Sequence, residues 1–248
     1  MTGQWLVEGV PAGPVRRRLF CLPFAGGGAA IFEPWRRALP DTAISAVRLP
    51  GRENRFREPA LADVDAVLAG LVPAVAARVA ADRGLPWAVF GYSLGGLLAY
   101  ELVARLAESG GPLPAVLLVG GAEPPHVPRH LPDVSWLPRE EFVGQLRELG
   151  GTSPEILEHP ELLDLLLPMV RADFRIVETH RGTARALPLP IVTYRGSDDD
   201  GVRPEAMARW SELTAASVTH RDIAGGHFVI SDRPADFISL VAADLGKY

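Results

Sequence analysis

This sequence has one cysteine, no excess of positive charge and no long apolar run. The single cysteine, Cys21, cannot form an intramolecular disulfide and cannot by itself build a cysteine-based zinc site. Because Cys21 lies within a short apolar run, we expect it to be a small buried residue. The formal net charge of -5 disfavours nucleic acid as the main partner.

Signals for a membrane span or a secretory leader are also missing. We find no stretch of about 20 apolar residues, which a membrane-spanning helix needs. The stretch Met1–Arg18 has no apolar run followed by a small-residue cleavage site. We therefore expect a cytoplasmic protein without a membrane partner. With 248 residues, of which 48% are hydrophobic and 22% charged, the chain can bury a sizeable core.

Short apolar runs alternate with helical patterns along much of the chain. Apolar runs bounded by Gly and Pro are typical of strands buried on both faces, and apolar residues three or four apart indicate helices. The alternation predicts an α/β fold, with a mostly parallel sheet and helices on both faces. Pro73 predicts a kink or a break in its helix. We expect strands at 18–22, 43–47, 87–90, 115–119, 190–194 and 218–223, and helices at 31–39, 61–83, 94–108, 204–213 and 234–245.

The alternation stops between about residues 121 and 186, where prolines cluster and no strand-like run occurs. Helical patterns are expected there from Pro138 to Leu149 and from Pro160 to Thr179. A partly apolar helical insertion of this kind is often a lid over a site, although it can also be a layer that only enlarges the core. We predict a single domain over residues 1–248 with a helical lid insertion at about 121–186.

The pentapeptide Gly91–Gly95, read Gly-Tyr-Ser-Leu-Gly, fits the G-x-S-x-G nucleophile elbow. In that motif a serine sits on a strained turn between a strand and a helix, which is the predicted context of Ser93. An ordinary turn is the alternative. A serine hydroxyl is a poor nucleophile at neutral pH and needs a base, usually a histidine held by a carboxylate.

His227 is the candidate base, because it follows the last predicted strand and precedes the last helix. His126 and His130 are four residues apart, but a proline lies between them, so we expect no helical metal pair and no metal site. The remaining histidines, at 159, 180 and 220, are expected at surface or helix-cap positions.

The acid should lie on a loop after an earlier strand. We favour Asp199, because the pattern G-x-x-D-x-x-V aligns with residues 196–202. Asp198 and Asp200 stay open as alternatives. Glu123 is a further candidate, because some enzymes of this architecture carry the acid one strand earlier.

Acyl transfer also needs hydrogen-bond donors for the oxyanion that develops on the carbonyl. The backbone N–H of Leu94, directly after the serine, is one candidate. The second should come from the glycine-rich loop after the first predicted strand, where glycines leave N–H groups unobstructed. We assign the backbone of Ala25, with Phe24 as its alternative.

Taken in order, several segments make this chain resemble the type II thioesterases that accompany polyketide synthases and non-ribosomal peptide synthetases, in the α/β-hydrolase superfamily. The matching segments are Leu19–Gly27, Leu49–Arg55, the elbow at Ser93, Leu166–Phe174, Glu178–His180 and Gly225–Phe228.

The resemblance implies a free-standing hydrolase that removes stalled or wrong acyl units from the phosphopantetheine thiol of acyl or peptidyl carrier proteins. It implies Ser93 as nucleophile, His227 as general base and acid, and Asp199 as the carboxylate that orients it. The protein would need no cofactor, because the substrate carries the phosphopantetheine.

Two departures from the family pattern leave the acyl preference open. The family usually has His where this chain has Tyr92, and Ser-Gly-Arg at residues 120–122, where this chain has Gly-Gly-Ala. A medium- or long-chain fatty-acyl thioesterase, a carboxylesterase on oxygen esters and a non-catalytic protein with this fold are the alternatives. The arginines at 48, 52, 55 and 57 either bind an acidic carrier protein with its phosphate or pair internally with Glu53 and Glu58.

Overall fold

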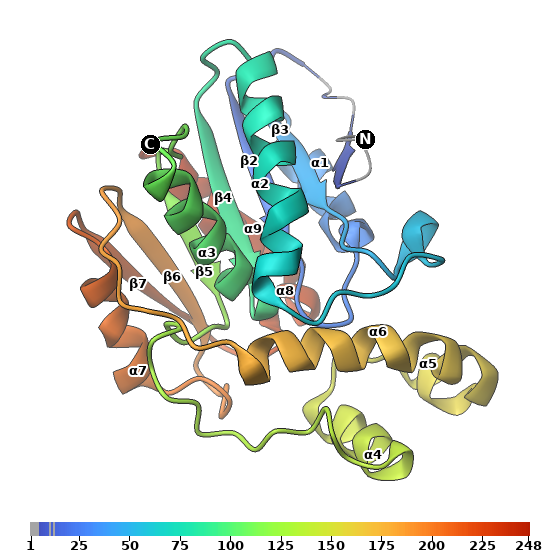
Figure 1. The fold of residues 1–248 in the computed structure, drawn as a ribbon. Coiled ribbons are helices and arrows are strands. Elements are labelled where there is room, and N and C mark those ends of the chain that lie inside the picture. The colour runs from blue at the N-terminus through green and yellow to red at the C-terminus, as the bar shows by residue number, and fades with distance from the viewer. Residues whose placement is uncertain (1–4, 10, 12) are drawn as a thin grey trace.

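A seven-stranded sheet forms the centre of the computed structural model, which describes residues 5–9, 11 and 13–248. Its strands are β1 (Leu6–Glu8), β2 (Arg17–Leu22), β3 (Thr42–Val47), β4 (Trp87–Tyr92), β5 (Leu117–Gly120), β6 (Ile191–Gly196) and β7 (Val218–Ile223). The strand order is β1-β3-β2-β4-β5-β6-β7. β1 pairs antiparallel with β3, and the other neighbours pair in parallel. Helices cover both faces (Figure 1), so the predicted α/β fold is confirmed.

The helices fall close to the predicted ranges. They are α1 (Glu33–Ala38), α2 (Val64–Ala81), α3 (Leu94–Glu108), α4 (Arg139–Leu149), α5 (Pro154–Glu158), α6 (Pro160–Thr179), α7 (Pro204–Ala208), α8 (Val229–Asp232) and α9 (Pro234–Leu245). The sequence patterns missed the short elements β1, α5 and α8, which offer too few residues to show a period. The helices predicted at 31–39 and 204–213 each divide into a 3₁₀ turn and a short α-helix.

The side chains of β2 show how both faces of the sheet are buried. Phe20 and Leu22 pack into the core beneath α2 and α3, whereas Leu19 and Cys21 pack on the opposite face with α1 and α9. Successive side chains of a strand point to opposite faces, and all four of these are fully buried. The prediction that Cys21 is a buried residue is confirmed.

The helix α2 runs unbroken through Pro73, so the predicted break is wrong. Pro73 faces solvent, where water can satisfy the carbonyl that loses its helical partner. By length and composition alone α2 could cross a membrane, which the sequence patterns did not single out. However, Val67, Leu68, Leu71 and Val75 on its inner face are buried in the core, as in a core helix of a globular domain.

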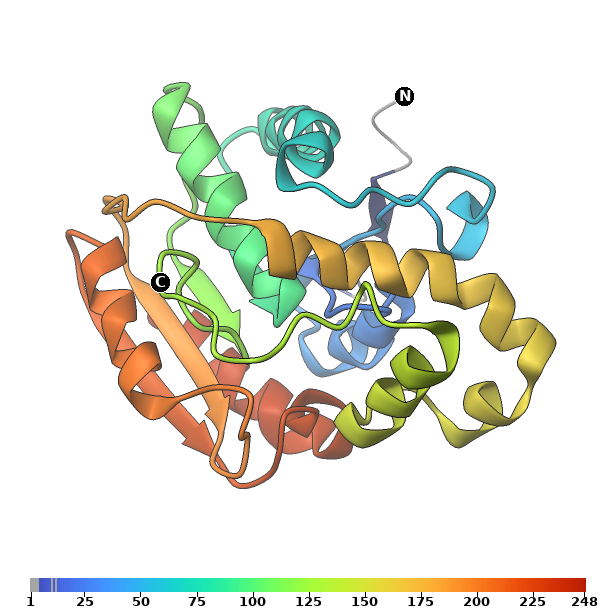
Figure 2. The ribbon, with the colours of Figure 1, turned by 60° about the horizontal axis from the view of Figure 1, so that its bottom comes forward.

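Between β5 and β6 the chain forms α4, α5 and α6. Figures 1 and 2 show these helices beyond the end of the sheet, with α6 extended across it. Buried apolar side chains of these helices, among them Phe142, Leu146 and Leu163, form a cluster separate from the two cores of the sheet, whereas Ile176 of α6 belongs to the core beneath α2 and α3. This α4–α6 segment, residues 121–190, occupies the position of the predicted insertion, and its role as a lid stays a prediction.

Candidate active site

The elbow at Ser93 joins β4 directly to α3. Ser93 has φ of 53° and ψ of -117°, a conformation that L-residues rarely adopt. Its N–H donates to the carbonyl of Gly120 at the end of β5, at 2.7 Å. The turn needs glycine on both sides, because a Cβ on Gly91 would lie 1.9 Å from the oxygen of Gly95, and one on Gly95 would lie 2.2 Å from the oxygen of Leu22.

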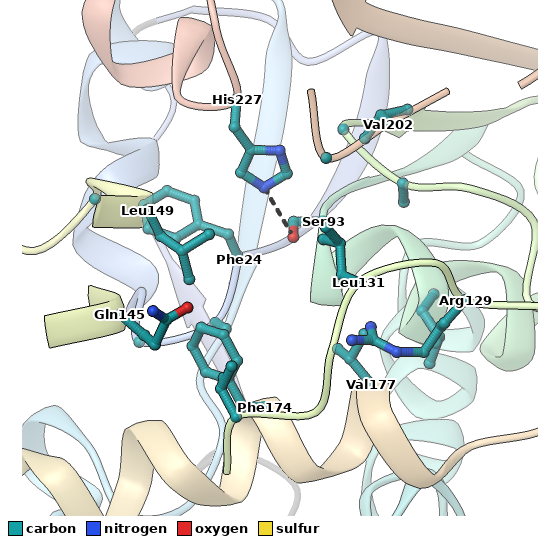
Figure 3. A pocket seen from close by; sticks show the side chains of 18 of the residues that line it. Phe24, Ser93, Arg129, Leu131, Gln145, Leu149, Phe174, Val177, Val202 and His227 are labelled. Atoms are coloured by element: carbon teal, nitrogen blue, oxygen red, sulfur yellow. Dashed lines mark hydrogen bonds between the residues drawn. The ribbon is translucent and has the colours of Figure 1, made fainter. Parts of the chain in front are cut away.

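The loop after β7 brings His227 to this serine. Its Nε2 lies 3.2 Å from Ser93 Oγ, the contact drawn as a dashed line in Figure 3. Ser93 and His227 are 134 positions apart in the sequence. They meet because the turn and the loop that carry them both lie at the carboxyl ends of the parallel strands. At this separation the imidazole can accept the serine proton.

Asp199 lies on the other side of the imidazole, in the loop after β6. Its Oδ2 is 2.7 Å from His227 Nδ1, and its Oδ1 accepts the N–H of Gly201 at 2.9 Å. Asp199 is 5% exposed, so little water competes for the carboxylate. This contact fixes the proton on Nδ1 and leaves Nε2 free to face the serine.

The structure places the other candidate acids elsewhere. Asp198 and Asp200 are exposed. Glu123 is held by the guanidinium of Arg203 through contacts of 2.8 and 2.9 Å. Among the described residues, only the carboxylate of Asp199 lies within hydrogen-bond distance of His227.

Several backbone N–H groups near Ser93 have no acceptor in the part of the chain that the structure describes, among them those of Phe24 and Gly95. Two others are the candidates for an oxyanion hole. One belongs to Leu94, the first residue of α3, where a helix always leaves its first N–H groups unpaired. The other belongs to Ala25, in the turn after β2. These are the two groups that the sequence assigned to an oxyanion hole.

A cavity of about 1080 Å³ opens beside Ser93 and His227, between the α4–α6 segment and the end of the sheet (Figure 3). Phe24, Leu149 and Phe174 line one part of it, and Leu131, Val177 and Arg129 line another. Most of the lining is apolar. The lining residues come from the α4–α6 segment and from the turns and loops that follow β2, β4, β6 and β7. Such a cavity suits the hydrocarbon part of a ligand.

Metal ligands do not gather anywhere in the described part of the chain, where no group of three or more His, Cys, Asp or Glu side chains could hold an ion. His126 instead contacts Glu212 at 2.9 Å, and His130 lies 3.7 Å from Glu123.

Tyr92 and Asp173 both lie within sequence motifs, but the sequence predicted no role in the site for either residue. The Tyr92 hydroxyl donates to the backbone carbonyl of His227 at 2.7 Å. Burial first, and then the charges of Asp199 and Asp232, raise the pKa of Tyr92, so the phenol keeps its proton and remains a donor. Asp173 of α6 contacts the turn that contains Ala25. Both contacts join residues more than 130 positions apart, which no local pattern reveals.

Comparisons with a family model, with related sequences and with solved structures all indicate a thioesterase. Residues 17–245 match the model of the thioesterase domain family. The chain is 30% identical to gramicidin S biosynthesis protein GrsT of Aneurinibacillus migulanus, over 98% of this chain and 94% of that one. It is 33% identical to thioesterase PikA5 of Streptomyces venezuelae, over 94% of this chain and 82% of that one.

Among solved structures, the type II thioesterase BorB from the borrelidin biosynthetic cluster superposes with a TM-score of 0.86 at 36% identity, covering 96% of each chain. With a family match that spans nearly the whole sheet and the α4–α6 segment, this chain belongs to the thioesterase domain family of α/β-hydrolase-type enzymes that act on thioesters.

Proposed function

We propose that this protein hydrolyses acyl thioesters on the phosphopantetheine arm of acyl or peptidyl carrier proteins, through an acyl-serine intermediate. The observation that carries the proposal is the chain of contacts from Ser93 to His227 to Asp199 at the wall of an apolar cavity. The family match supports a thioester as the bond that is cleaved.

In the first half of the reaction, Ser93 Oγ attacks the thioester carbonyl carbon while His227 Nε2 takes the serine proton. The electron pair of the C=O bond moves onto the oxygen, which accepts hydrogen bonds from the N–H groups of Leu94 and Ala25. Losing one such donor raises the barrier by about 3–4 kcal/mol. The C–S bond then breaks, and His227 returns the proton to the departing pantetheine thiol.

In the second half, a water molecule attacks the acyl-Ser93 ester. His227 takes the proton of the water and later returns it to Ser93 Oγ, which releases the free acid. Asp199 stays ionised throughout, holds the imidazole in the productive tautomer and stabilises the imidazolium. Every proton and electron pair is supplied by the protein's own residues, the substrate and water, so the protein itself uses no cofactor.

The names of the relatives suggest the setting. GrsT is a gramicidin S biosynthesis protein, and BorB comes from the borrelidin biosynthetic cluster. We infer a cytoplasmic editing enzyme that clears aberrant acyl units from a polyketide synthase or a non-ribosomal peptide synthetase. The α4–α6 segment, which lines the cavity, would act as its lid, and the whole chain would form a single domain.

The test compares hydrolysis of a hexanoyl-pantetheine thioester with that of a matched oxygen ester, by the parent protein and by Ser93→Ala. We expect preferential thioester cleavage that is lost in Ser93→Ala, with Ser109→Ala as a control that keeps it. Equal cleavage of both substrates would indicate a carboxylesterase. Activity retained in Ser93→Ala would overturn the mechanism. Palmitoyl- and hexanoyl-carrier protein assayed side by side separate an editing enzyme from a long-chain fatty-acyl thioesterase.

A further inference from the structure

A fully buried carboxylate of α6 contacts the turn that carries Ala25. Asp173 is 0% exposed, and its Oδ2 accepts the backbone N–H of Gly26 at 2.7 Å. The two residues are 147 positions apart. The helix α6 is therefore hydrogen-bonded directly to the loop that supplies one of the two oxyanion-hole donors in the proposed mechanism.

The geometry of the turn explains what this bond does. The N–H of Gly27 donates to the carbonyl of Phe24 at 2.9 Å, which closes a β-turn over residues 24–27. Gly26, third in the turn, has φ of +78°, the value that a type II turn requires at that position. The N–H of Gly27 is used inside the turn and that of Gly26 is used by Asp173, so the N–H groups of Phe24 and Ala25 are left for a ligand oxygen. The proposed mechanism uses that of Ala25.

Arg52 holds the carboxylate of Asp173 in place. Its guanidinium donates to both oxygens of Asp173, at 2.9 and 2.6 Å, and also to the carbonyl of Gly27 at 2.8 Å. Arg52 is 5% exposed. The fork geometry prevents the carboxylate from rotating, and the positive charge neutralises Asp173, so an oxyanion nearby meets a neutral pair.

The neighbouring arginines make different contacts. Arg48 pairs with Glu53 at 2.6 Å, and Arg55 pairs with Glu58 at 2.6 Å. Arg48 and Arg55 thus pair internally with glutamates, which is one of the two alternatives that the sequence left open for these arginines. Arg52 differs from these two arginines because its guanidinium donates a hydrogen bond to the backbone of the turn.

We propose that Asp173 and Arg52 are positioning residues of the oxyanion hole, which clamp the Phe24–Gly27 turn so that the N–H of Ala25 faces the reacting carbonyl. The inference rests on the proposed function and deepens it. It also makes α6 a fixed support of the active site, so any opening of the cavity has to come from other parts of the α4–α6 segment.

The same helix provides a matched control. Glu178 of α6 is 1% exposed and accepts the backbone N–H groups of Val134 and Ser135 at 2.7 and 3.0 Å. It is therefore a second buried carboxylate of α6 that holds a loop, but that loop is not the one with Ala25. A variant at Glu178 loosens the attachment of α6 without touching the oxyanion turn.

The experiment measures the following for each variant: kcat and KM for hexanoyl-pantetheine, the inhibition constant of an alkylthio trifluoromethyl ketone, and the inhibition constant of S-hexyl-pantetheine, a thioether without a carbonyl. The ketone forms a bond to Ser93 Oγ, its carbonyl electron pair becomes an oxyanion, and the serine proton moves to His227. Its affinity therefore reports the oxyanion hole, whereas the thioether, which has no carbonyl oxygen, reports binding of the alkyl chain and the pantetheine arm alone.

For Asp173→Asn we expect kcat to fall about 100-fold with KM nearly unchanged. The affinity for the ketone should weaken by the same factor, and that for S-hexyl-pantetheine should not change. Because a single change leaves an unpaired buried charge, the double variant Arg52→Met/Asp173→Leu is the second test. It removes both charges, so we expect a folded protein with the same loss of kcat and ketone affinity. Glu178→Gln should keep both.

Asp173→Asn or the double variant with kcat and ketone affinity within threefold of the parent would overturn the inference. An equal loss in Glu178→Gln would also overturn it, because general loosening of α6 would then be the cause. A parent that neither hydrolyses the thioester nor binds the ketone overturns the proposed function and this inference together. An active parent with an unaffected Asp173→Asn overturns the inference alone.

Discussion

The hydroxyl of Tyr92 donates to the backbone carbonyl of His227 across 2.7 Å. Tyr92 immediately precedes Ser93, so this bond joins the loop of the base to the strand that carries the nucleophile. The ring of Tyr92 is fully buried, and the backbone of β5 lies against it. A Cβ on Gly120 would lie 2.5 Å from the ring, and one on Gly121 would lie 2.8 Å from it. The departures from the family pattern at positions 92 and 120 therefore belong together, because a larger ring at position 92 requires glycine at position 120.

The first prediction concerns that hydrogen bond. Tyr92→Phe keeps the ring and removes the donor, so the loop of His227 loses its anchor to β4. We expect kcat for thioester hydrolysis to fall about tenfold with little change in KM, and the free energy of unfolding to fall by about 1 kcal/mol. Steady-state kinetics and urea unfolding measure the two effects.

Tyr100→Phe is the matched control for Tyr92→Phe. Tyr100 is also fully buried, and its hydroxyl donates to the backbone carbonyl of Arg185 at 2.9 Å, away from the triad. It should lose a similar amount of stability and keep its kcat. Equal kinetic losses in the two variants would show that the bond of Tyr92 has no special relation to the base.

The second prediction concerns the fit between positions 92 and 120. Gly120→Ser places a Cβ against the Tyr92 ring, and such overpacking should destabilise the fold by about 1–3 kcal/mol. In a Tyr92→His background the smaller ring should remove most of that cost. A double-mutant cycle of unfolding free energies measures the coupling. Additive effects would contradict the idea that the two positions form one unit.

The third prediction assigns the acid. Asp199→Asn keeps the shape of the side chain but stabilises the wrong tautomer of His227, so we expect kcat to fall by on the order of 10³–10⁴-fold. Asp198→Asn and Asp200→Asn, at exposed positions of the same loop, should stay within a factor of two or three of the parent. A near-normal rate in Asp199→Asn would direct the assignment to Glu123, which the structure pairs with Arg203.

The fourth prediction concerns acid stability. Burial alone would raise the pKa of Asp244, but hydrogen bonds from Arg221 and Lys247 outweigh it, so the pKa lies below the ordinary value of an aspartate. A carboxyl whose pKa is lowered by folding stabilises the folded state above the pKa of the unfolded chain. That contribution disappears as the pH falls from about 4 through the folded pKa. Asp244→Asn should therefore lose less stability than the parent between pH 5 and about pH 2.

Unfolding free energies measured across that pH range test the fourth prediction. Asp236→Asn is the control, because Asp236 pairs with Arg233 at 2.7 Å on an exposed part of α9. The free energy of unfolding of Asp236→Asn should change with pH in the same way as that of the parent protein. If the free energy of unfolding of the parent protein did not decrease at pH values under 4, the link between the ionisation of Asp244 and stability would be contradicted.

Local sequence patterns were enough to predict the α/β architecture, the strand-turn-helix context of Ser93 and the loop of His227. These features follow from local patterns: buried strands read as apolar runs, helices as three- and four-residue spacing, and the elbow as glycines around a serine. Pro73 shows a limit of such patterns. A proline predicts a break from its own chemistry, but the buried inner face of α2 holds the helix together, and the proline sits on the solvent side.

Which side chains come into contact depends on the three-dimensional arrangement of the loops and helices. The pattern G-x-x-D-x-x-V favoured Asp199 among three consecutive aspartates but left Asp198 and Asp200 open. The turn after β6 places Asp199 against His227, whereas its two neighbours face solvent. Asp173 and Arg52 are 121 positions apart, and Tyr92 contacts a carbonyl 135 positions away. Such contacts depend on how the sheet edge and α6 come together in space, and a hydrogen bond between distant segments leaves no period or spacing along the chain by which it could be predicted.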